Sequence, residues 1–281
     1  MNLKDLLNYA KIYLNKNKIE DAGIISKLLI EYVFNIEKEK IILFYEKELD
    51  ENSIKSYKNL LEKIVLGVPI QYIINKQEFM KLTFYVDENV LIPQPDTEIL
   101  VEEIINQYNG KKCKILDLCT GSGAIAIALA KYLEYAEIVA SDISVKALQI
   151  AKLNAEKNLV HRKIKFIESD MFTKINDNNF DIIVSNPPYI KTEVIKQLDT
   201  QVKKEPNIAL DGGQDGLKFY KTIISNSYKY LANNGKIFLE IGYDQKEDVI
   251  NLLNKSNYYE DIYSKKDLGK NDRIIVASIR R

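Results

Sequence analysis

The sequence predicts a doubly wound α/β fold with a mostly parallel sheet, preceded by a small helical domain. Three observations support this prediction: purely helical spacing of apolar residues near the N-terminus, five apolar strands that alternate with helices, and two strand-like segments at the end. Nearly continuous apolar strands are typical of a parallel sheet that helices cover on both faces. At 281 residues the chain is about twice the usual length of a single domain, which favours two domains.

Residues 1–70 are expected to form the helical domain. Their apolar residues recur at helical spacing without strand-like alternation, and Gly67 and Pro69 are expected to end the last helix. Residues 71–95 are expected to form a β-hairpin linker, because the runs FMKLTFYV and NVLI are β-like and are separated by Asp87 and Glu88.

Residues 96–281 are expected to form the α/β domain. It begins with a helix capped by Asp96 or Thr97, after which five strands alternate with helices: KILDLC (114–119), EIVASD (137–142), KIKFIES (163–169), FDIIVS (180–185) and KIFLEIG (236–242). The final runs YYEDIYSKK and RIIVASIRR have no long helix between them, which predicts two antiparallel strands. The sheet is therefore expected to have seven strands.

Composition narrows the classes of function. The chain has 40 basic and 40 acidic residues, so no net charge draws it to nucleic acid or anionic lipid. The N-terminus has no signal-like apolar core, and the longest apolar run is too short to cross a bilayer. Two cysteines, Cys113 and Cys119, and a single histidine suit a reducing compartment and argue against a zinc site. We expect a cytoplasmic protein with no membrane association and no metal.

A glycine-rich loop follows the first of the five strands. TGSGAIA (120–126) fits the pattern Gly-x-Gly-x-x-Gly/Ala at the start of a helix, where a ligand can lie against bare backbone. Asp142 ends the next strand and can accept both hydroxyl protons of a ribose. This combination predicts a nucleoside-containing cofactor, although the glycines alone could simply form a tight turn. Asp117, before the loop, favours S-adenosylmethionine (SAM) over a dinucleotide, because it could meet the ammonium of a methionine moiety or hold the amides of the loop.

The tetrapeptide Asn186-Pro187-Pro188-Tyr189 follows the fourth of these strands, at the sheet edge where α/β proteins bind ligands. Proline has no amide hydrogen, so this turn presents carbonyl acceptors together with the Asn186 side-chain oxygen. An amide or exocyclic amine becomes nucleophilic when hydrogen bonds hold both its protons and disfavour planarity. Orientation and fixed dipoles then provide the catalysis without a strong base. Tyr189 is expected to pack against the planar substrate group, the alternative being a core tyrosine.

With these motifs the sequence resembles the release factor glutamine N5-methyltransferase family over nearly its whole length. The other family-like blocks are GVPIQYI (67–73), VLIPQPDTE (90–98), EPNIALDGGQDGL (205–217), FLEIG (238–242) and DLGKNDR (267–273). The resemblance implies a SAM-dependent enzyme that methylates the side-chain amide nitrogen of the glutamine in the Gly-Gly-Gln motif of class 1 peptide chain release factors. It also implies that the helical domain docks this substrate.

The resemblance assigns roles to individual positions. The loop implied to hold the methionine end of SAM consists of Cys119, Thr120, Gly121, Ser122 and Gly123. Asp142 would bind the ribose, and Asp170 and Met171 would border the adenine. Asn186, Pro187, Pro188 and Tyr189 would bind the glutamine amide, with Asn186, Pro187 and Tyr189 catalytic and Asn186 also bordering the cofactor.

Three positions depart from the family pattern: Cys119 replaces a glycine, Gln94 replaces a common arginine, and Met171 stands where an aromatic residue can occur. A positive φ at Cys119 would be strained. We expect these changes to tune affinity without abolishing function. The tripeptide Gly212-Gly213-Gln214 matches the substrate motif by coincidence and is expected to form a turn.

Two alternatives stay open at this point. A nucleic-acid adenine N6 methyltransferase would present the same NH₂ group to the same tetrapeptide. The zero net charge and the absence of an arginine-rich segment argue against it, although Lys196, Lys203 and Lys204 could form a local basic patch. The second alternative is a SAM-binding module without catalytic activity that serves as an adaptor for translation factors.

Overall fold

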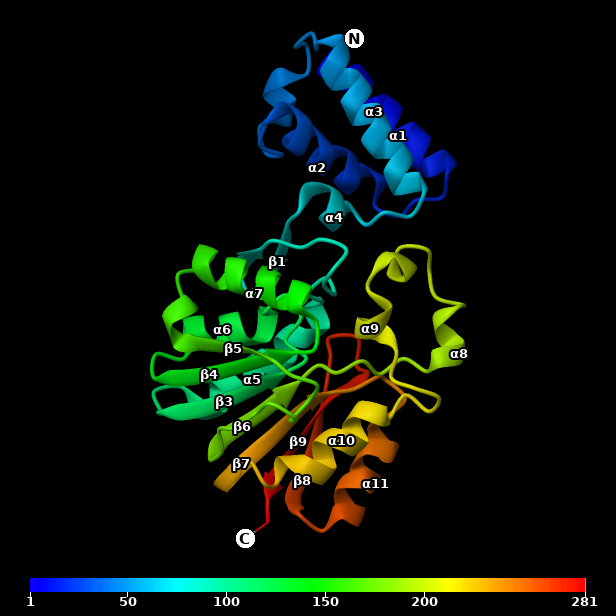
Figure 1. The fold of residues 1–281 in the computed structure, drawn as a ribbon. Coiled ribbons are helices and arrows are strands. Elements are labelled where there is room, and N and C mark those ends of the chain that lie inside the picture. Colours follow the sequence, from blue (N-terminus) through cyan, green and yellow to red (C-terminus); the bar gives the residue numbers. More distant parts are fainter. Residues whose placement is uncertain (281) are drawn as a thin grey trace. The chain divides into compact units, whose positions relative to one another are not determined.

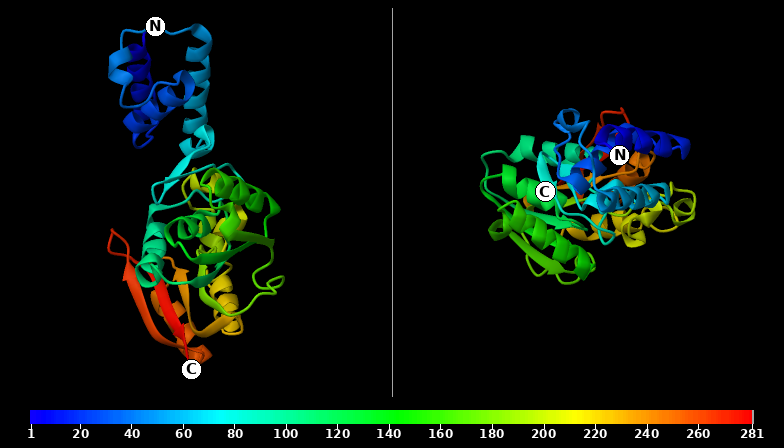
Figure 2. Two further views of the ribbon diagram at one scale, coloured as in Figure 1. Left: turned by 90° about the vertical axis from the view of Figure 1, so that its left-hand side faces the viewer. Right: turned by 90° about the horizontal axis from the view of Figure 1, so that it is seen from above.

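The structure is a computed structural model that describes residues 1–280, drawn in Figures 1 and 2. The chain forms two compact units. A helical unit contains Met1–Asn75 and the short segment Asp199–Lys204, and an α/β unit contains Lys76–Leu198 and the chain from Glu205 onward. No helix within the described residues has the length and apolar content needed to cross a bilayer.

The helical unit packs its helices around one apolar core. Its elements are α1 (Leu3–Lys16), α2 (Ala22–Phe34), η1 (Ile41–Phe44), α3 (Glu51–Val65) and α4 (Ile70–Ile74), with η3 (Val202–Lys204) in the separate segment. Asn2 and Asp50 cap α1 and α3, because each side chain accepts a hydrogen bond from a backbone N–H in the first turn. Tyr57 is fully buried, and its hydroxyl donates to the Ser26 carbonyl at 3.0 Å.

A short hairpin begins the α/β unit. Strands β1 (Gln77–Phe79) and β2 (Leu82–Phe84) pair antiparallel around Met80 and Lys81, which both have positive φ, at 50° and 58°. The prediction that the hairpin turns at Asp87 and Glu88 is wrong, because NVLI forms no strand. Asp87 instead accepts hydrogen bonds from the backbone and side-chain nitrogens of Asn89, and such local bonds compete with strand pairing.

The predicted seven-stranded, mostly parallel sheet is confirmed, with the strand order β5-β4-β3-β6-β7-β9-β8. The strands are β3 (Cys113–Leu118), β4 (Ala136–Asp142), β5 (Ile164–Glu168), β6 (Phe180–Ser185), β7 (Leu231–Glu240), β8 (Tyr259–Lys266) and β9 (Asp272–Ile279). The first five are parallel, whereas β9 runs antiparallel to β7 and β8, as predicted for the last two strands. The strand order reverses at β3, because the chain continues to β4 and β5 on one side of it and then to β6 and β7 on the other. Ligands bind at such switch points.

Helices cover both faces of the sheet (Figure 1). One face packs against α5 (Pro95–Tyr108), α6 (Ala124–Tyr132) and α7 (Val145–Lys157), and the other against α10 (Lys218–Ser227) and α11 (Lys246–Ser256). Shorter helices in the connections are η2 (His161–Lys163), α8 (Thr192–Ile195) and α9 (Asn207–Leu210). The N-cap of α5 is Gln94, followed by Pro95, so the predicted cap at Asp96 or Thr97 is wrong. Proline suits the first helical position because its φ is already helical.

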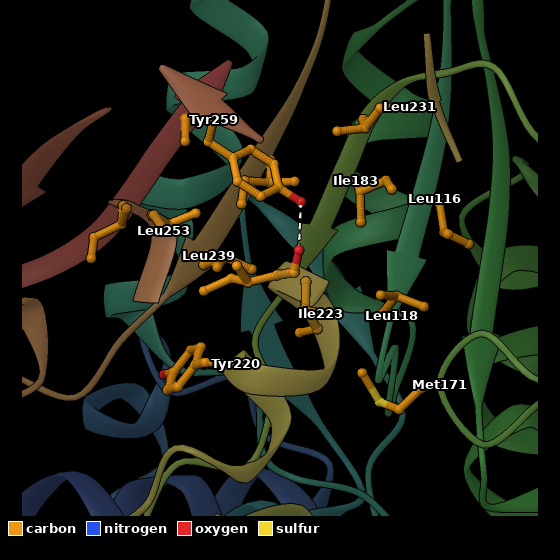
Figure 3. Packing of buried hydrophobic residues seen from close by; sticks show 14 of the residues in the cluster. Leu116, Leu118, Met171, Ile183, Tyr220, Ile223, Leu231, Leu239, Leu253 and Tyr259 are labelled. Carbon is orange, nitrogen blue, oxygen red and sulfur yellow. Dashed lines mark hydrogen bonds between the residues drawn. The ribbon is translucent and has the colours of Figure 1, made fainter. Parts of the chain in front are cut away.

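The core beneath α10 and α11 fixes the strands that end at the cavity described below. Alternate residues of the central strands, such as Leu116, Leu118 and Ile183, belong to the same buried cluster as Ile223 of α10 and Leu253 of α11 (Figure 3). Full burial of each such side chain contributes roughly 1.5–3 kcal/mol. The carboxyl ends of β3 and β6 are therefore held rigidly.

Candidate active site

The loop Cys119–Gly123 joins β3 to α6 through three residues of positive φ, namely Cys119 at 60°, Gly121 at 55° and Gly123 at 82°. The Thr120 amide donates to the Ser141 carbonyl at 2.9 Å, which fastens the loop to the end of β4. A Cβ built on Gly121 would meet no described atom within 4 Å, so the backbone there is bare. Cys119 does carry a Cβ, and its positive φ fulfils the condition for strain.

A cavity lies at the carboxyl ends of β3, β4 and β6, and its wall brings together predicted residues from four separate segments. These residues are Cys119, Gly121, Asp142, Asp170, Met171, Asn186 and Pro188. The wall also includes residues that the sequence analysis did not single out, mainly Asn89, Val90, Leu91, Ile143, Pro206, Ile208 and Phe219. The signal for several of them was present in the blocks VLIPQPDTE and EPNIALDGGQDGL.

The remaining predicted loop residues lie behind the wall in the described part of the chain. Asp117 is fully buried, and its Oδ2 accepts a hydrogen bond from the Thr120 hydroxyl at 2.6 Å. No group within residues 1–280 pairs with its Oδ1, and burial raises the pKa of Asp117 to about 7. The Ser122 carbonyl accepts from Asn154, and Gly123 lies close to α7, where a Cβ would approach Ala151 at 3.1 Å. These residues shape the loop and do not line the cavity.

Asp142 is positioned by backbone donors at the end of β4. Its Oδ2 accepts from the Gly121 amide at 2.8 Å, and its Oδ1 accepts from the Ser144 amide at 2.9 Å. Burial raises the pKa of this carboxyl above its usual value. Each oxygen keeps a further lone pair, so a diol at the wall can still donate to both oxygens. The bare Gly121 backbone beside this carboxylate fits a nucleoside cofactor.

The tetrapeptide Asn186–Tyr189 forms a rigid corner after β6. The Ser185 hydroxyl donates to the Leu118 carbonyl at 2.7 Å, which ties the ends of β6 and β3 together. The Gln245 side chain donates to the Tyr189 carbonyl at 2.9 Å. A Cβ on Gly212 would lie 2.7 Å from the Tyr189 Cα, so only glycine fits against the corner there. The segment Gly212–Gln214 therefore supports the tetrapeptide, and Gln214 lies in a turn, as predicted.

Two members of the tetrapeptide do not line the cavity in the described structure. Pro187 is buried within the corner, and contact of its carbonyl with a substrate stays a prediction. The Tyr189 side chain packs against the core beneath α10 and α11, and burial raises its pKa well above the usual value. Stacking of Tyr189 on a substrate group stays a prediction.

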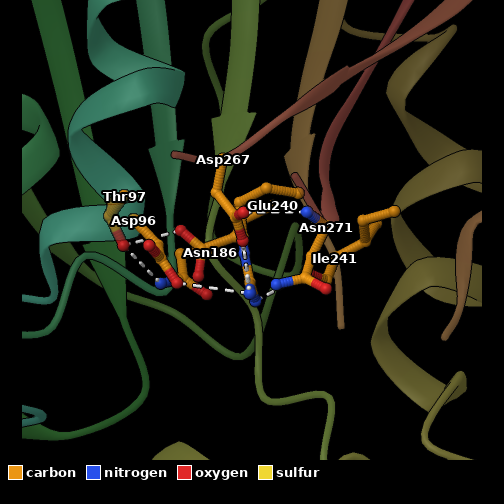
Figure 4. Close-up of polar contacts among 8 residues, drawn as sticks. Asp96, Thr97, Asn186, Glu240, Ile241, Asp267 and Asn271 are labelled. Carbon is orange, nitrogen blue, oxygen red and sulfur yellow. Dashed lines mark hydrogen bonds and ion pairs between the residues drawn. The ribbon is translucent and has the colours of Figure 1, made fainter. Parts of the chain in front are cut away.

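Behind Asn186 lies a set of polar side chains that, apart from Asn186 itself, were not identified from the sequence as part of a site (Figure 4). We call it the Asn186 network: Asp96, Thr97, Asn186, Glu240, Asp267 and Arg273. Asn186 Nδ2 donates to Thr97 Oγ1 at 3.2 Å, and Thr97 Oγ1 donates to Glu240 Oε2 at 2.6 Å. Glu240 is buried at the end of β7, and burial raises its pKa to about 7 against the opposing effects of Thr97 and Arg273.

Arg273 supplies the positive charge of the Asn186 network. Its guanidinium donates to Asp267 Oδ2 through Nη2 at 2.9 Å and through Nε at 3.1 Å, and Nη2 lies 3.2 Å from Asp96 Oδ2. The blocks VLIPQPDTE, FLEIG and DLGKNDR, widely separated in sequence, thus converge behind the tetrapeptide. Within residues 1–280 no group of histidine, cysteine and acidic side chains is arranged to hold a metal ion.

Comparisons with known proteins agree with this arrangement. A family model described as the PrmC N-terminal domain matches residues 5–74, and a methyltransferase small domain model matches residues 94–205. The chain is 40% identical to a release factor glutamine methyltransferase of Clostridium acetobutylicum, covering 99% of this chain and 98% of that one. It is also 40% identical to the protein of the same name from Clostridium botulinum, covering 99% of both chains.

A solved structure shares the fold. The 16S rRNA N2 G1207 methyltransferase of Thermus thermophilus, in complex with AdoMet and guanosine, has a TM-score of 0.52 and 19% identity, covering 73% of this chain and 50% of that one. The expectation of a SAM-dependent enzyme is confirmed by the family models and the curated relatives together. The chain is a methyltransferase and belongs to the release factor glutamine methyltransferase family.

Proposed function

We propose that this enzyme transfers a methyl group from SAM to the side-chain amide nitrogen, N5, of the glutamine in the Gly-Gly-Gln motif of class 1 peptide chain release factors. The observation that supports this most directly is the shared wall: Asp142, the Gly121 backbone and Asn186 line one cavity. When bound, SAM supplies an electrophilic methyl group on a positively charged sulfur. A cofactor side and an amide-binding corner thus lie within one site.

The cofactor side is assigned from the residues of the wall. We propose that Cys119 and Gly121 contact the methionine end, Asp142 accepts from the ribose hydroxyls, and Asp170 and Met171 border the adenine. Thr120, Ser122 and Gly123 hold the loop in shape from behind. Asp117 acts through its hydrogen bond with Thr120, and the unpaired Oδ1 leaves it capacity for one more donor.

The amide-binding side acts by accepting hydrogen bonds from the NH₂ group of the substrate glutamine. The Asn186 side-chain oxygen and the Pro187 carbonyl accept the two N–H bonds of the substrate carboxamide, and Pro188 keeps the corner rigid. Holding both hydrogens out of the amide plane exposes the nitrogen lone pair toward the methyl group. The nitrogen would gain the methyl group as the carbon–sulfur bond of SAM breaks, and S-adenosylhomocysteine would be the leaving product. The extra proton on the nitrogen would then leave to solvent, so no strong base is required. Preorganised acceptors of this kind contribute on the order of 100-fold or more to a rate.

The remaining assignments concern partners and location. We propose that the helical unit docks the release factor and that the enzyme works in the cytoplasm, where translation termination takes place. The balanced charge, 40 basic against 40 acidic residues, gives no general attraction to nucleic acid. The adenine N6 alternative is therefore not favoured.

Mass spectrometry tests this proposal. A purified class 1 release factor, DNA and RNA are each incubated with the enzyme and SAM, and a release factor carrying Gly-Gly-Glu serves as the matched control. We expect one added methyl group on the motif glutamine and none on the control or on nucleic acid. Methylation of nucleic acid would support the alternative enzyme, and binding of SAM and release factor without any transfer would support the adaptor.

A further inference from the structure

The orientation of the Asn186 carboxamide decides what the corner can bind. One end of this side chain only accepts hydrogen bonds and the other only donates them, and a half turn exchanges the two. If the NH₂ end faced the cavity, it would meet the NH₂ group of the substrate and no hydrogen bond would form. The protein must therefore contain a feature that keeps the oxygen toward the cavity.

The contacts behind Asn186 provide that feature. While Glu240 is ionised, its carboxylate can only accept, so the single hydroxyl hydrogen of Thr97 is given to Glu240 Oε2, 2.6 Å away. Thr97 Oγ1 can then only accept, and the 3.2 Å contact with Asn186 requires the NH₂ end of Asn186 to face Thr97. Both Thr97 and Glu240 are buried, at 4% and 2% exposure, so water does not compete for these bonds.

We propose that Thr97 and Glu240 are positioning residues, which hold Asn186 through this directed chain of hydrogen bonds with its side-chain oxygen toward the substrate amide. This inference rests on the proposed function. Neither residue needs to touch substrate or cofactor. Because α5 begins at Pro95, Thr97 lies within its first turn, where its side chain reaches Glu240 at the end of β7.

The direction of the hydrogen bonds that link Asn186, Thr97 and Glu240 depends on the charge of Glu240. The groups that face it are Asp96 and Thr97 from α5, Arg273 from β9, and Asn186 and Tyr189 after β6, while the Tyr220 hydroxyl of α10 donates to its backbone carbonyl at 2.8 Å. Arg273 favours the ionised form and Asp96 opposes it. A protonated Glu240 could donate to Thr97, which would then donate to Asn186 and turn its NH₂ end toward the cavity. Lower pH should therefore reverse the donors and acceptors in this series of hydrogen bonds.

The first experiment compares Thr97→Val with Thr97→Ser in the full-length enzyme. Valine has nearly the same shape but no hydroxyl, whereas serine keeps the hydroxyl. We expect Thr97→Val to lower kcat for release factor methylation by about 10- to 100-fold with an unchanged Kd for SAM, and Thr97→Ser to keep most of the activity. A wild-type kcat in Thr97→Val, or an equal loss in both variants, would overturn the inference.

The second experiment uses pH and does not depend on the folding of Thr97→Val. Because the pKa of Glu240 is raised to about 7, wild-type kcat should fall as the pH drops below that value. Glu240→Gln cannot ionise, so its kcat should lose this acid limb. An identical acid limb in both proteins would contradict the inference.

A third measurement is independent of turnover. The side-chain NH₂ signals of Asn186, assigned by their loss in Asn186→Ala, should exchange slowly with solvent in the wild-type enzyme and faster in Thr97→Val. Equal exchange rates would count against the inference. If the wild-type enzyme failed to methylate the release factor yet showed this protection, the proposed function would fail while the orientation of Asn186 would stand.

Discussion

The two sides of the cavity are built in different ways. On the cofactor side, the Gly121 amide meets Asp142 across 21 residues of chain, and the loop takes its shape from backbone of positive φ. On the substrate side, Thr97 meets Glu240 across 143 residues, and side chains from four segments must coincide. The cofactor side should therefore tolerate changes in side chains, whereas the substrate side should depend on each of its partners.

The largest effect is expected for Asn186→Ala. The variant removes the side-chain acceptor for the substrate amide, so methyl transfer should fall by about 100-fold or more while SAM binding stays nearly unchanged. Single-turnover kinetics with calorimetry of SAM binding would measure both quantities. Asn207→Ala, at an exposed position, is the control and should behave like wild type. Unchanged turnover in Asn186→Ala would remove the assigned role.

Asp142→Ala probes the carboxylate that we assign to the ribose on the cofactor side. Loss of hydrogen bonds to a charged acceptor should weaken SAM binding by roughly 1.5–3 kcal/mol, or about 10- to 150-fold in Kd. Isothermal calorimetry would measure the Kd for SAM. Glu168→Ala is a matched control, because Glu168 pairs with Asp142 in the sheet register but is exposed. Equal Kd values for all three proteins would place the ribose elsewhere.

Gly212→Ala tests whether the substrate corner depends on support from distant chain. The added Cβ would lie 2.7 Å from the Tyr189 Cα, and this overpacking should lower the free energy of unfolding by about 1–3 kcal/mol, with a loss of transfer activity. Urea unfolding followed by circular dichroism would measure the free energy of unfolding. In Gly23→Ala the nearest atom would be 4.0 Å away, within helix α2, so this control should be slightly stabilised. Full activity of Gly212→Ala would show that the corner does not need this contact.

The smallest effect is expected for Cys119→Gly. Glycine relieves the positive φ of 60° but loses the sulfur contact with Met171, so the two changes should nearly cancel in stability, within about 1 kcal/mol. The Kd for SAM should change by less than about threefold, because the backbone forms this wall. Cys113→Ala is the control, because it removes a thiol at the opposite end of β3 and leaves the loop Cys119–Gly123 unchanged. A tenfold change in Kd for Cys119→Gly alone would break the contrast between the two sides.

The sequence was sufficient for the fold because its signals are local. Period and length of the apolar runs predicted the parallel strands and the antiparallel pair at the end, and the structure confirms both. The hairpin turn was misplaced because Asp87 satisfies nearby backbone and side-chain donors, an effect that apolar periodicity does not report. The cap of α5 was misplaced for a similar reason: Thr97 has a good capping side chain, but that side chain bonds to Glu240.

For the site, too, local motifs could be predicted from the sequence, whereas contacts between distant segments could not. Gly121, Asp142 and Asn186 were found from motifs and Cys119 from the family resemblance, and the structure brings all four to one wall. The roles of Glu240 and Arg273 could not be inferred, since their meaning arises only when β7 and β9 lie beside α5. The blocks that contain them were visible as a family resemblance, but the residues that they contact were not.

A crystal structure with S-adenosylhomocysteine and a peptide carrying the motif glutamine would show whether the corner holds the amide hydrogens next to the methyl donor. We expect the cofactor sulfur beside the corner, with the glutamine NH₂ within hydrogen-bond distance of Asn186 Oδ1 and the Pro187 carbonyl, and with Asn186 Nδ2 donating to Thr97. A sulfur remote from the corner, or a glutamine amide bound by other residues, would contradict it.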